Sequence, residues 1–541
     1  MKAPPGDLYA PRMTVHLGAY GKVVSKTLRR LDAERVVPRI WDHDHTVWRP
    51  DPDGIIDRLG WLDLPSTMRE EESAITAFAE EMRRAGFRYV VLFGMGGSSL
   101  AAEVLRQTCA PSDHPLKLIV LDSTIPRAVR ETEAAIDPAH TLFIVSSKSG
   151  TTIEPNVLYR HFRQLVDGEV GKERAGDRFV AITDSGTPLE RLAQHEGFRR
   201  VFTPPSDVGG RYSALSHFGL LPAALAGADI RSLLDRSASM ASRCITESLA
   251  KENPGALLGA AMGALTREGR DKLTLIASPP VAAFGMWVDQ LIAESTGKDG
   301  MGIVPIVNEP LTATENYGDD RLFVYLRVEG DGDKEVNEAM NDLRDHGHPV
   351  IVITLGDSQD LGGEFFRWEF ATAVASSILS VHPFDQPNVQ ASKEQTLEVL
   401  DEIESADELP KTDPTGSIED LLRQARTGDY LAIMVYVRPT PATERALADL
   451  RRDVMERYKI ATTFGYGPRL LHSTGQLHKR GPNTGLSLQI VSDDHVDVSI
   501  PGRGYSFGAL ATAQAVGDFR TLQRLGRRVI RVNAKSIAGL D

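Results

Sequence analysis

The sequence predicts an α/β fold with two doubly wound parallel-sheet domains and a third, C-terminal α/β domain. Short apolar runs typical of buried strands alternate with helix-like segments along most of the chain. This pattern restarts after Asn253-Pro254-Gly255, and it starts once more after an acidic, proline-containing stretch at 405–415. A chain of 541 residues is also too long for a single hydrophobic core. We therefore expect an N-terminal extension followed by three domains, and their expected bounds are 1–72, 73–248, 249–403 and 404–541.

The composition excludes several classes of protein. Hydrophobic residues make up 41% of the chain and charged residues 25%, as in an ordinary soluble globular protein. A net charge of -13 without a Lys/Arg run argues against binding to nucleic acid or to an anionic membrane. The two cysteines, Cys109 and Cys244, predict neither a disulfide framework nor a metal cluster. Because no signal-peptide core or membrane-spanning apolar run is present, we expect a cytoplasmic protein.

The first domain opens with an amphipathic helix expected over 73–86 and a strand over 89–93. A glycine-rich turn, Gly94-Met-Gly-Gly-Ser-Ser99, and a second helix follow. Glycines let the backbone approach a ligand, and free N–H groups at a helix start favour an anion. Asp122, at the end of the next strand, would suit a dinucleotide site, but Ser99 replaces the third glycine of that motif. The serines fit a sugar-phosphate site better.

A second hydroxyl-rich turn follows the strand expected over 141–145. Its sequence, Ser146-Ser-Lys-Ser-Gly-Thr-Thr152, holds five hydroxyls and one lysine ahead of a helix. A capping box would explain one or two of these hydroxyls, but not all five. Hydroxyls and backbone N–H groups beside a cation are typical of a phosphate cradle. With a further strand over 179–183, these turns predict a site at the carboxyl ends of a parallel sheet.

Two charged residues stand in largely uncharged surroundings. Arg211 follows two glycines and could hold a phosphate or a developing enolate oxygen; a structural arginine that pins a loop is the alternative. After a strand at 273–277, a helix over 281–293 carries Gln290 and Glu294 on one face. A carboxylate on so apolar a helix is either exposed at the helix end beside Lys298, paired, or held with a raised pKa for proton transfer.

The remaining apolar runs complete the second and third domains. The second domain is expected to contain strands over 322–326 and 350–354 and a helix over 364–379. The C-terminal domain is expected to contain strands over 430–436 and 486–491 and helices over 442–458 and 508–525.

Five stretches together resemble the phosphoglucose isomerase family, whose members are built from two sugar isomerase (SIS) domains. They occur in the family's order over about 300 residues, which is more specific than any single motif. The stretches are GMGGSS (94–99), SKSGTT (147–152), DVGGRYS (207–213), WVDQLIAESTGKDG (287–300) and HPFDQPNVQASK (382–393).

The resemblance implies a role for each matching residue. Glu294 would be the base that moves a proton between C1 and C2, with Gln290 beside it. Arg211 would stabilise the enediolate, and Lys393 would assist ring opening. The residues expected around the sugar phosphate are Gly97, Ser98, Ser147, Lys148, Ser149 and Thr152.

The chain departs from the family pattern in three places. Asn388 and Gln390 stand where the family has Gly and Glu, and His217 stands where a small residue is usual. The third departure is the ring-opening histidine, which the family places a few tens of residues after the catalytic glutamate. The stretch 307–317 contains no histidine.

A candidate for the missing histidine occurs much later, at His472. Its surroundings, Leu470-Leu-His-Ser-Thr-Gly-Gln476, are similar to the family's His-Ser-x-Gly-Gln segment. We infer that this segment has moved within the chain and kept its role in taking and returning the ring hydroxyl proton. His478 is the reserve candidate, and His382, just before a proline, is expected to be structural. The tail also resembles isomerases fused behind a transaldolase, but no transaldolase portion is expected ahead of residue 1.

The resemblance implies interconversion of glucose 6-phosphate and fructose 6-phosphate through a cis-enediol, a step of glycolysis and gluconeogenesis. No metal or nucleotide cofactor is expected, and the partner is a small sugar phosphate. A homodimer is expected from the resemblance alone. The alternatives are isomerisation of a related sugar phosphate, such as mannose 6-phosphate, and a non-catalytic sugar-phosphate-binding regulator. A regulator would need a partner module that the acidic chain lacks, and it would have no use for Glu294.

Overall fold

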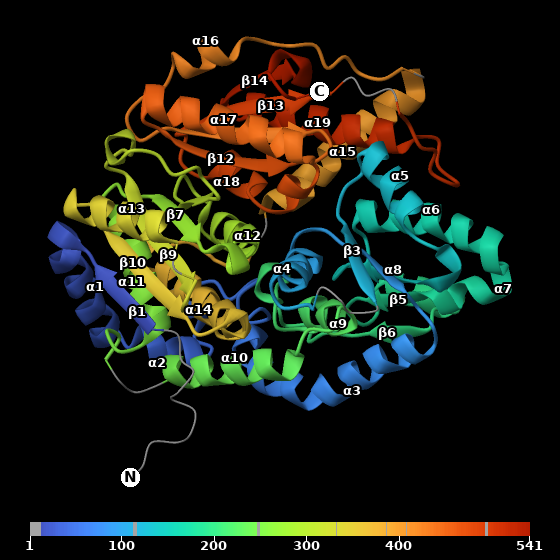
Figure 1. Cartoon of the computed structure of the whole chain (residues 1–541), viewed down its shortest axis with the longest axis horizontal. Coiled ribbons are helices and arrows are strands. Elements are labelled where there is room, and N and C mark those ends of the chain that lie inside the picture. Colours follow the sequence, from blue (N-terminus) through green and yellow to red (C-terminus); the bar gives the residue numbers. More distant parts are fainter. Residues whose placement is uncertain are drawn as a thin grey trace.

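The fold is described from a computed structural model that covers residues 12–111, 116–245, 249–331, 333–385, 387–406, 408–492 and 496–540. Three sheets, each flanked by helices, make up the molecule. The first and second sheets lie side by side, and the C-terminal domain lies across both of them (Figure 1). The α/β architecture predicted from the sequence is confirmed. No helix among the described residues is both long and apolar enough to cross a membrane.

The first sheet has five parallel strands in the order β3-β2-β4-β5-β6. Its central strands are apolar throughout because helices cover both faces. Val90 and Leu92 face one buried cluster, whereas Val91 and Phe93 face another. The strands are β2 (Tyr89–Phe93), β3 (Lys117–Leu121), β4 (Thr141–Ser146), β5 (Phe179–Ile182) and β6 (Arg200–Phe202). The helices are α3 (Leu64–Arg84), α4 (Leu100–Thr108), α5 (Pro126–Ala135), α6 (Ile153–Val170), α7 (Lys172–Ala175), α8 (Pro188–His195), α9 (His217–Leu225) and α10 (Ile230–Cys244).

The strand order of this sheet places a ligand site between β2 and β4. From β2 the chain crosses to β3 on one side, and from β4 it crosses to β5 on the other. The turns after β2 and β4 therefore diverge at their carboxyl ends, where open α/β sheets bind ligands. These are the two glycine- and hydroxyl-rich turns singled out in the sequence.

The second sheet has the order β1-β10-β9-β7-β8, and its strands β7 to β10 are parallel to one another, as expected for the second domain. Strand β1, from the N-terminal extension, pairs antiparallel with β10 at the edge. The strands are β1 (Arg12–His16), β7 (Lys272–Ala277), β8 (Val304–Val307), β9 (Arg321–Val328) and β10 (Val350–Leu355). The helices are α1 (Gly21–Ala33), α2 (Val36–Trp41), α11 (Pro254–Arg267), α12 (Phe284–Thr296), α13 (Lys334–Asp345) and α14 (Leu361–Leu379).

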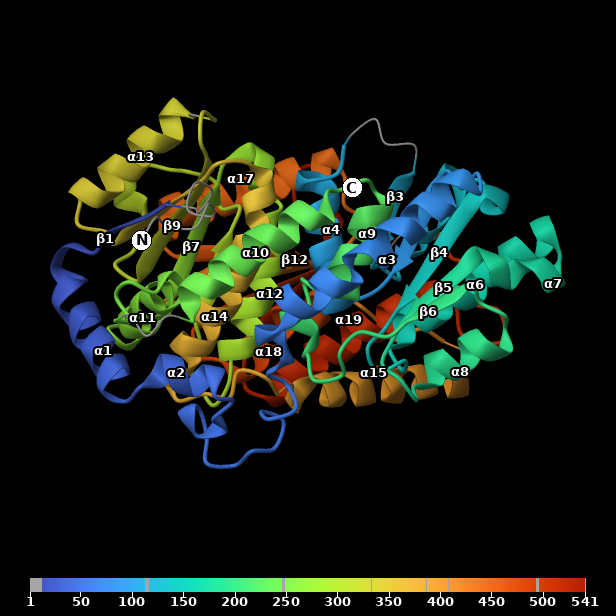
Figure 2. The same cartoon turned by 90° about the horizontal axis from the view of Figure 1, so that it is seen from below.

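Helix α14 is a centre of packing between the first two domains. All its residues except Ser377 are buried, and α10, α11 and α12 pack against it. Helix α10 also contacts α3, and Figure 2 shows these two helices running across one face of the molecule. The two sheets are therefore held in a fixed relation by an apolar layer of helices.

The C-terminal domain contains a four-stranded parallel sheet in the order β12-β11-β13-β14. This order repeats that of β8-β7-β9-β10 in the second domain. The strands are β11 (Tyr430–Tyr436), β12 (Ala461–Tyr466), β13 (Gly485–Val491) and β14 (Arg528–Asn533). The helices are α15 (Pro387–Ala406), α16 (Ile418–Leu422), α17 (Pro441–Tyr458), α18 (Gly475–Arg480) and α19 (Phe507–Arg524).

This third domain is docked on both of the others through buried apolar contacts. Leu400 of α15 and Phe507 of α19 share a cluster with Val157 of α6. On the other side, Ile306 of β8 packs in a cluster with Leu477 of α18. Two-sided docking fixes the segment between β12 and α18 relative to both sheets.

The predicted elements differ from the observed ones mainly at short or polar strands. Strands β1, β6, β8, β12 and β14 were not predicted, because they are short or rich in charged and hydroxyl side chains. The helix expected over 73–86 begins at Leu64. The domain boundary expected at 72 therefore lies inside α3. The domain boundary expected at 403 lies inside α15.

Candidate active site

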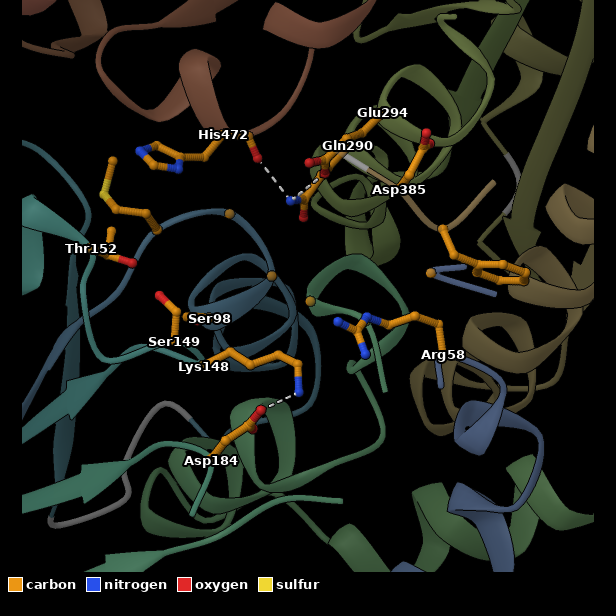
Figure 3. Close-up of a pocket in the computed structure, with 17 residues that line it drawn as sticks. Arg58, Ser98, Lys148, Ser149, Thr152, Asp184, Gln290, Glu294, Asp385 and His472 are labelled. Carbon is orange, nitrogen blue, oxygen red and sulfur yellow. Dashed lines mark hydrogen bonds and ion pairs between the residues drawn. The ribbon is translucent and has the colours of Figure 1, made fainter. Parts of the chain in front are cut away.

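A cavity of about 430 Å³ lies where the turns after β2, β4 and β5 meet α12 and the C-terminal domain (Figure 3). Loops from the first and second domains and from the N-terminal extension contribute to its wall. Its lining residues are Gly54, Arg58, Met95, Gly96, Gly97, Ser98, Lys148, Ser149, Thr152, Asp184, Gly209, Gly210, Gln290, Glu294, Phe384, Asp385 and His472.

One wall of the cavity is rich in hydroxyl groups. Ser98, Ser149 and Thr152 line it, and Thr152 directly precedes α6. Ser147 does not line the cavity; its Oγ lies 2.9 Å from Thr152 Oγ1, behind the wall. Hydroxyls at the start of a long helix form an environment suited to a phosphate group. Ser147 would therefore position Thr152 instead of contacting a ligand.

Lys148 lies on the same wall but is already paired. Its Nζ lies 2.6 Å from Asp184 Oδ2 and donates to the carbonyl of Ser206 at 2.9 Å. Burial raises the pKa of Asp184, and the neighbouring Lys148 ammonium opposes that rise. Asp184 follows β5 and was not predicted as a site residue. Much of the Lys148 charge is balanced within the protein.

Two glycines allow the turn after β2 to pack tightly. Gly96 has φ +52°, and a Cβ there would lie 2.6 Å from the His472 carbonyl oxygen. A Cβ on Gly97 would lie 2.0 Å from the carbonyl oxygen of Gly210. Real Cβ atoms do not approach backbone this closely, so only glycine permits the contact of Gly96 with the C-terminal segment and the contact of Gly97 with the Gly210 turn of the first domain.

Glu294 lies on the opposite wall and is buried on α12. Gln290, one helical turn earlier, donates from Nε2 to Glu294 Oε2 at 3.1 Å and to the His472 carbonyl at 2.8 Å. Burial raises the pKa of Glu294, although Arg211 and Lys298 oppose the rise. The alternative of a solvent-exposed glutamate at the helix end is therefore excluded.

Arg211 is buried beside Glu294, just outside the cavity lining. Its Nε donates to Ser295 Oγ at 2.8 Å, and its Nη2 donates to the carbonyls of Asp385, at 3.0 Å, and Pro383. Its Nη1 lies 3.7 Å from Glu294 Oε1. Neither Arg211 Nη1 nor the buried Gln290 Oε1 has a hydrogen-bond partner among the described residues. A bound molecule with hydroxyl or enolate oxygens could satisfy both atoms.

Lys298 anchors the loop that carries Phe384 and Asp385. Its Nζ donates to the Asp385 carboxylate and carbonyl and to the His382 carbonyl. Burial, together with Arg211, lowers the pKa of Lys298 to about 7. Burial alone would raise the pKa of Asp385, but Lys298 outweighs it and leaves that pKa lowered. The sequence indicated only that Lys298 lies close to Glu294.

His472 reaches the cavity wall within the same chain, and its ring contacts a second carboxylate. His472 Nε2 lies 2.9 Å from Glu154 Oε1. Gln514 of α19 donates to that oxygen at 2.7 Å, and Thr124 donates to Gln514 Oε1 at 2.7 Å. Glu154 was missed as a site residue. An acidic residue in the first turn of the helix after the hydroxyl-rich turn was the signal that could have found it.

The other histidine candidates and Lys393 have different surroundings. His478 is buried against Tyr430, with Nδ1 3.1 Å from its hydroxyl, and burial lowers the pKa of His478 to about 3. His382 uses both ring nitrogens on backbone, with Nε2 3.1 Å from the Asp53 carbonyl and Nδ1 accepting from the Phe384 N–H. His217 is buried, which lowers its pKa to about 4. The Lys393, Asn388 and Gln390 side chains lie outside the described residues.

Comparison with known proteins relates these features to one family. The sequence model of the family described as phosphoglucose isomerase matches residues 74–314. The chain is similar to the glucose-6-phosphate isomerase of Staphylococcus saprophyticus, with 30% identity over 387 residues, 64% of this chain and 87% of that protein. It is 31% identical over 388 residues to the glucose-6-phosphate isomerase of Symbiobacterium thermophilum, covering 63% of this chain and 86% of that protein.

Solved structures share the fold. A hypothetical protein from Thermus thermophilus superposes with a TM-score of 0.62 at 23% identity, covering 72% of this chain and 99% of that one. A glucose-6-phosphate isomerase from Chlamydia trachomatis gives a TM-score of 0.52 at 19% identity, covering 71% of this chain and 84% of that one. The family match includes the cavity turns and Glu294 but ends before His472. By its sequence similarity over most of the length of these relatives, the chain belongs to the phosphoglucose isomerase family.

Proposed function

We propose that the protein is a glucose-6-phosphate isomerase that interconverts glucose 6-phosphate and fructose 6-phosphate. One observation carries the proposal: a single cavity has a hydroxyl-rich helix start on one wall and a buried glutamate with a raised pKa on the other. The first feature suits the phosphate of a sugar phosphate. The second suits a base that removes a proton from carbon, because a raised pKa makes the carboxylate a stronger base. The names of the relatives at about 30% identity support the same activity.

In the proposed reaction Glu294 takes the C2 proton of the open-chain aldose and returns it at C1. Gln290 holds the carboxylate through Nε2, which fixes the direction from which the proton is removed. Removal of the proton leaves a cis-enediolate, whose negative oxygen needs a donor. Arg211 Nη1, 3.7 Å from Glu294 Oε1, is the donor that we assign to it.

Ring opening comes before proton transfer and is assigned to His472, with Lys393 as the second group. Ionised Glu154 can only accept a hydrogen bond, so it favours the tautomer in which His472 Nε2 carries the proton. Nδ1 is then the ring atom able to accept the proton of the sugar hydroxyl. We assign phosphate binding to the turns that contain Gly97, Ser98, Ser149 and Thr152, with Ser147 and Lys148 supporting them.

Several further assignments remain proposals of the same kind. We propose that 73–248 and 249–403 are the two sugar isomerase domains and that 404–541 is a domain that supplies His472. The strand orders β3-β2-β4-β5 and β8-β7-β9-β10 follow the same pattern, which supports the likeness of the first two domains. The N-terminal extension over 1–72, the likeness of the tail to isomerases fused behind a transaldolase, the homodimer and the cytoplasmic location stay predictions from the sequence.

The test separates ring opening from proton transfer by using two substrates. Glucose 6-phosphate isomerisation is measured with a coupled assay for fructose 6-phosphate. Deuterium exchange at C2 is measured by NMR on an aldotetrose 4-phosphate, which cannot close to a furanose because its O4 is esterified. The variants are Glu294→Gln and His472→Ala, and His195→Ala on the exposed end of α8 is the control.

We expect Glu294→Gln to lose at least about 100-fold in both assays, because general base catalysis contributes 10²–10⁴-fold. His472→Ala should lose activity on glucose 6-phosphate and keep exchange on the tetrose. His195→Ala should match wild type. If the wild-type enzyme acts on mannose 6-phosphate but not on glucose 6-phosphate, the proposed substrate is wrong. Binding of the sugar phosphate without any exchange would indicate a sugar-phosphate sensor.

A further inference from the structure

The segment 53–60 of the N-terminal extension connects loops of both domains beside the cavity. At one end, the Asp53 carbonyl lies 3.1 Å from His382 Nε2. At the other, the Gly60 N–H donates to the Asp207 carbonyl at 3.0 Å, and Leu59 forms a bridge with Val208. Both ends are therefore held by the loops that carry Asp385 and Gly209 into the cavity wall.

The side chains of this segment keep its backbone in place. Ile55 and Leu59 are fully buried, and so is Trp61, which follows directly. Buried apolar side chains on both sides of Arg58 fix the position from which its side chain extends. The segment therefore presents Arg58 on a rigid backbone.

Arg58 lines the cavity, and Figure 3 shows its guanidinium directed into it, on the side of Lys148 and Asp184. Its Nη1 donates to the Asp57 carbonyl at 2.6 Å and to the Asp57 carboxylate at 2.8 Å. The Asp57 side chain is 58% exposed, so this ion pair is largely screened by solvent. Nε and Nη2 of Arg58 have no hydrogen-bond partner among the described residues.

The charges around the cavity show why a second cation matters at the hydroxyl-rich wall. Lys148 is balanced by Asp184 at 2.6 Å, with both side chains about one-fifth exposed. On the opposite side, Lys298 donates to Asp385. Arg211 donates to the Pro383 carbonyl and faces Glu294. Among the described residues, Arg58 and Lys148 are the only arginine and lysine that line the cavity. A phosphate dianion bound there would meet one neutralised cation and one guanidinium.

We propose that Arg58 is a further substrate-binding residue, which pairs with the phosphate of the sugar phosphate. The guanidinium presents a planar pair of donors that matches phosphate oxygens, and such charge-assisted bonds are among the strongest in proteins. The electrostatic effect of Arg58 reaches Asp184 and opposes the rise in the pKa of that carboxyl, which agrees with a position at this end of the cavity. The N-terminal extension is then part of the active site. This inference rests on the proposed function.

The test measures binding without turnover. The probe is glucitol 6-phosphate, which has no carbonyl group and cannot be isomerised, and its affinity is measured by isothermal titration calorimetry. The variants are Arg58→Gln, which removes the charge, and Arg58→Lys, which keeps it. Arg49→Gln is the matched control, because Arg49 lies in the same extension and pairs with the exposed Asp299.

We expect Arg58→Gln to weaken glucitol 6-phosphate binding about 10- to 100-fold, as expected for the loss of a charge-assisted contact. Arg58→Lys should lose less, Arg49→Gln should stay within about twofold of wild type, and all three should unfold at the wild-type temperature. Binding by Arg58→Gln within about twofold of wild type, or an equal loss in Arg49→Gln, would overturn the inference. Wild-type isomerisation of glucose 6-phosphate is measured in parallel. A wild type that binds the probe but does not isomerise contradicts the proposed function and leaves the role of Arg58 to be judged from binding.

Discussion

His472 Nε2 lies 2.9 Å from Glu154 Oε1, a contact between residues 318 positions apart in the chain. It joins the C-terminal domain to the first helix turn after the hydroxyl-rich loop. The Glu154 carboxylate is buried and also accepts from Gln514, so it has a defined direction. A fixed carboxylate holds the imidazole in one tautomer and one orientation, as in other acid–base pairs. The orientation of the proposed ring-opening group therefore depends on a residue of another domain.

Replacing Glu154 with Gln should impair ring opening selectively. An amide can donate or accept, so the His472 tautomer is no longer enforced. We expect the kcat on glucose 6-phosphate to fall on the order of 10²-fold with little change in KM. Deuterium exchange at C2 of an aldotetrose 4-phosphate should stay within about threefold of wild type. Glu133→Gln is the control. It alters a carboxylate–histidine pair outside the cavity lining, in which Glu133 Oε2 lies 3.4 Å from His161 Nε2. Equal losses on both substrates would contradict a role in ring opening.

Gln514 is expected to act as a positioning residue for this pair. Gln514→Leu removes the 2.7 Å bond to Glu154 and leaves Thr124 without its acceptor. A hydrogen bond of this kind contributes about 1 kcal/mol, so we expect a fall in kcat of about 5- to 10-fold on glucose 6-phosphate. The tetrose exchange should be unchanged. The control is Gln523→Leu, at an exposed position on the same helix, and it should keep both activities. A change in KM alone would argue for substrate contact instead.

The stability of the protein should depend on pH through Glu294. Burial raises its folded-state pKa, so between the unfolded value and that raised value the folded state binds more protons than the unfolded state. Stability from this group is thus complete below the unfolded pKa and is lost as pH rises through the folded pKa. Glu294→Gln cannot ionise and escapes this loss.

Thermal unfolding at pH 5.5 and pH 8 checks this prediction. The melting temperature of Glu294→Gln minus that of wild type should be larger at pH 8 than at pH 5.5. The same difference for Glu252→Gln, at an exposed position, should not depend on pH. A difference for Glu294→Gln that shrinks as pH rises would show that the buried cations, and not burial, dominate the ionisation of Glu294.

Docking of the C-terminal domain should depend on Glu309. Its carboxylate accepts from Arg321 Nη1 at 2.6 Å and from the Thr462 N–H at 2.7 Å, all within buried surroundings. Glu309→Ala would leave the Arg321 guanidinium buried without its main partner, which costs about 3–5 kcal/mol in the free energy of unfolding. Denaturant unfolding measures this cost, with the exposed Glu315→Ala as the control. A loss below about 1 kcal/mol would mean that the ion pair contributes little to docking.

Local sequence features predicted much of the fold and part of the site. Strands such as β2 and β4 were recognised because both faces are covered, which makes their sequences apolar throughout. The turns that follow them carry glycines and hydroxyls, so Ser98, Ser149 and Thr152 could be identified from short stretches. Gln290 and Glu294 were found together because helical spacing alone puts both on one face.

Other features depended on contacts between distant segments. The antiparallel pairing of β1 with β10 joins residues more than 300 positions apart, and no local pattern encodes it. Lys148 has an ordinary sequence context, and only the fold brings Asp184 to it. Arg58 lies in a polar segment without a motif, and buried neighbours on either side turn its position into part of the cavity wall.

The sequence by itself determined the α/β class, the position of the glycine- and hydroxyl-rich turns and the carboxylate on α12, because strand burial, turn chemistry and helix periodicity are local properties. Only the tertiary structure decided which charged groups meet. His472 contacts Glu154, Lys148 contacts Asp184, and Arg211 faces Glu294, because strand order and domain docking bring together segments that are separate in the chain. Ion pairs and hydrogen bonds depend on distances of a few ångströms, and those distances are set by packing and not by sequence spacing.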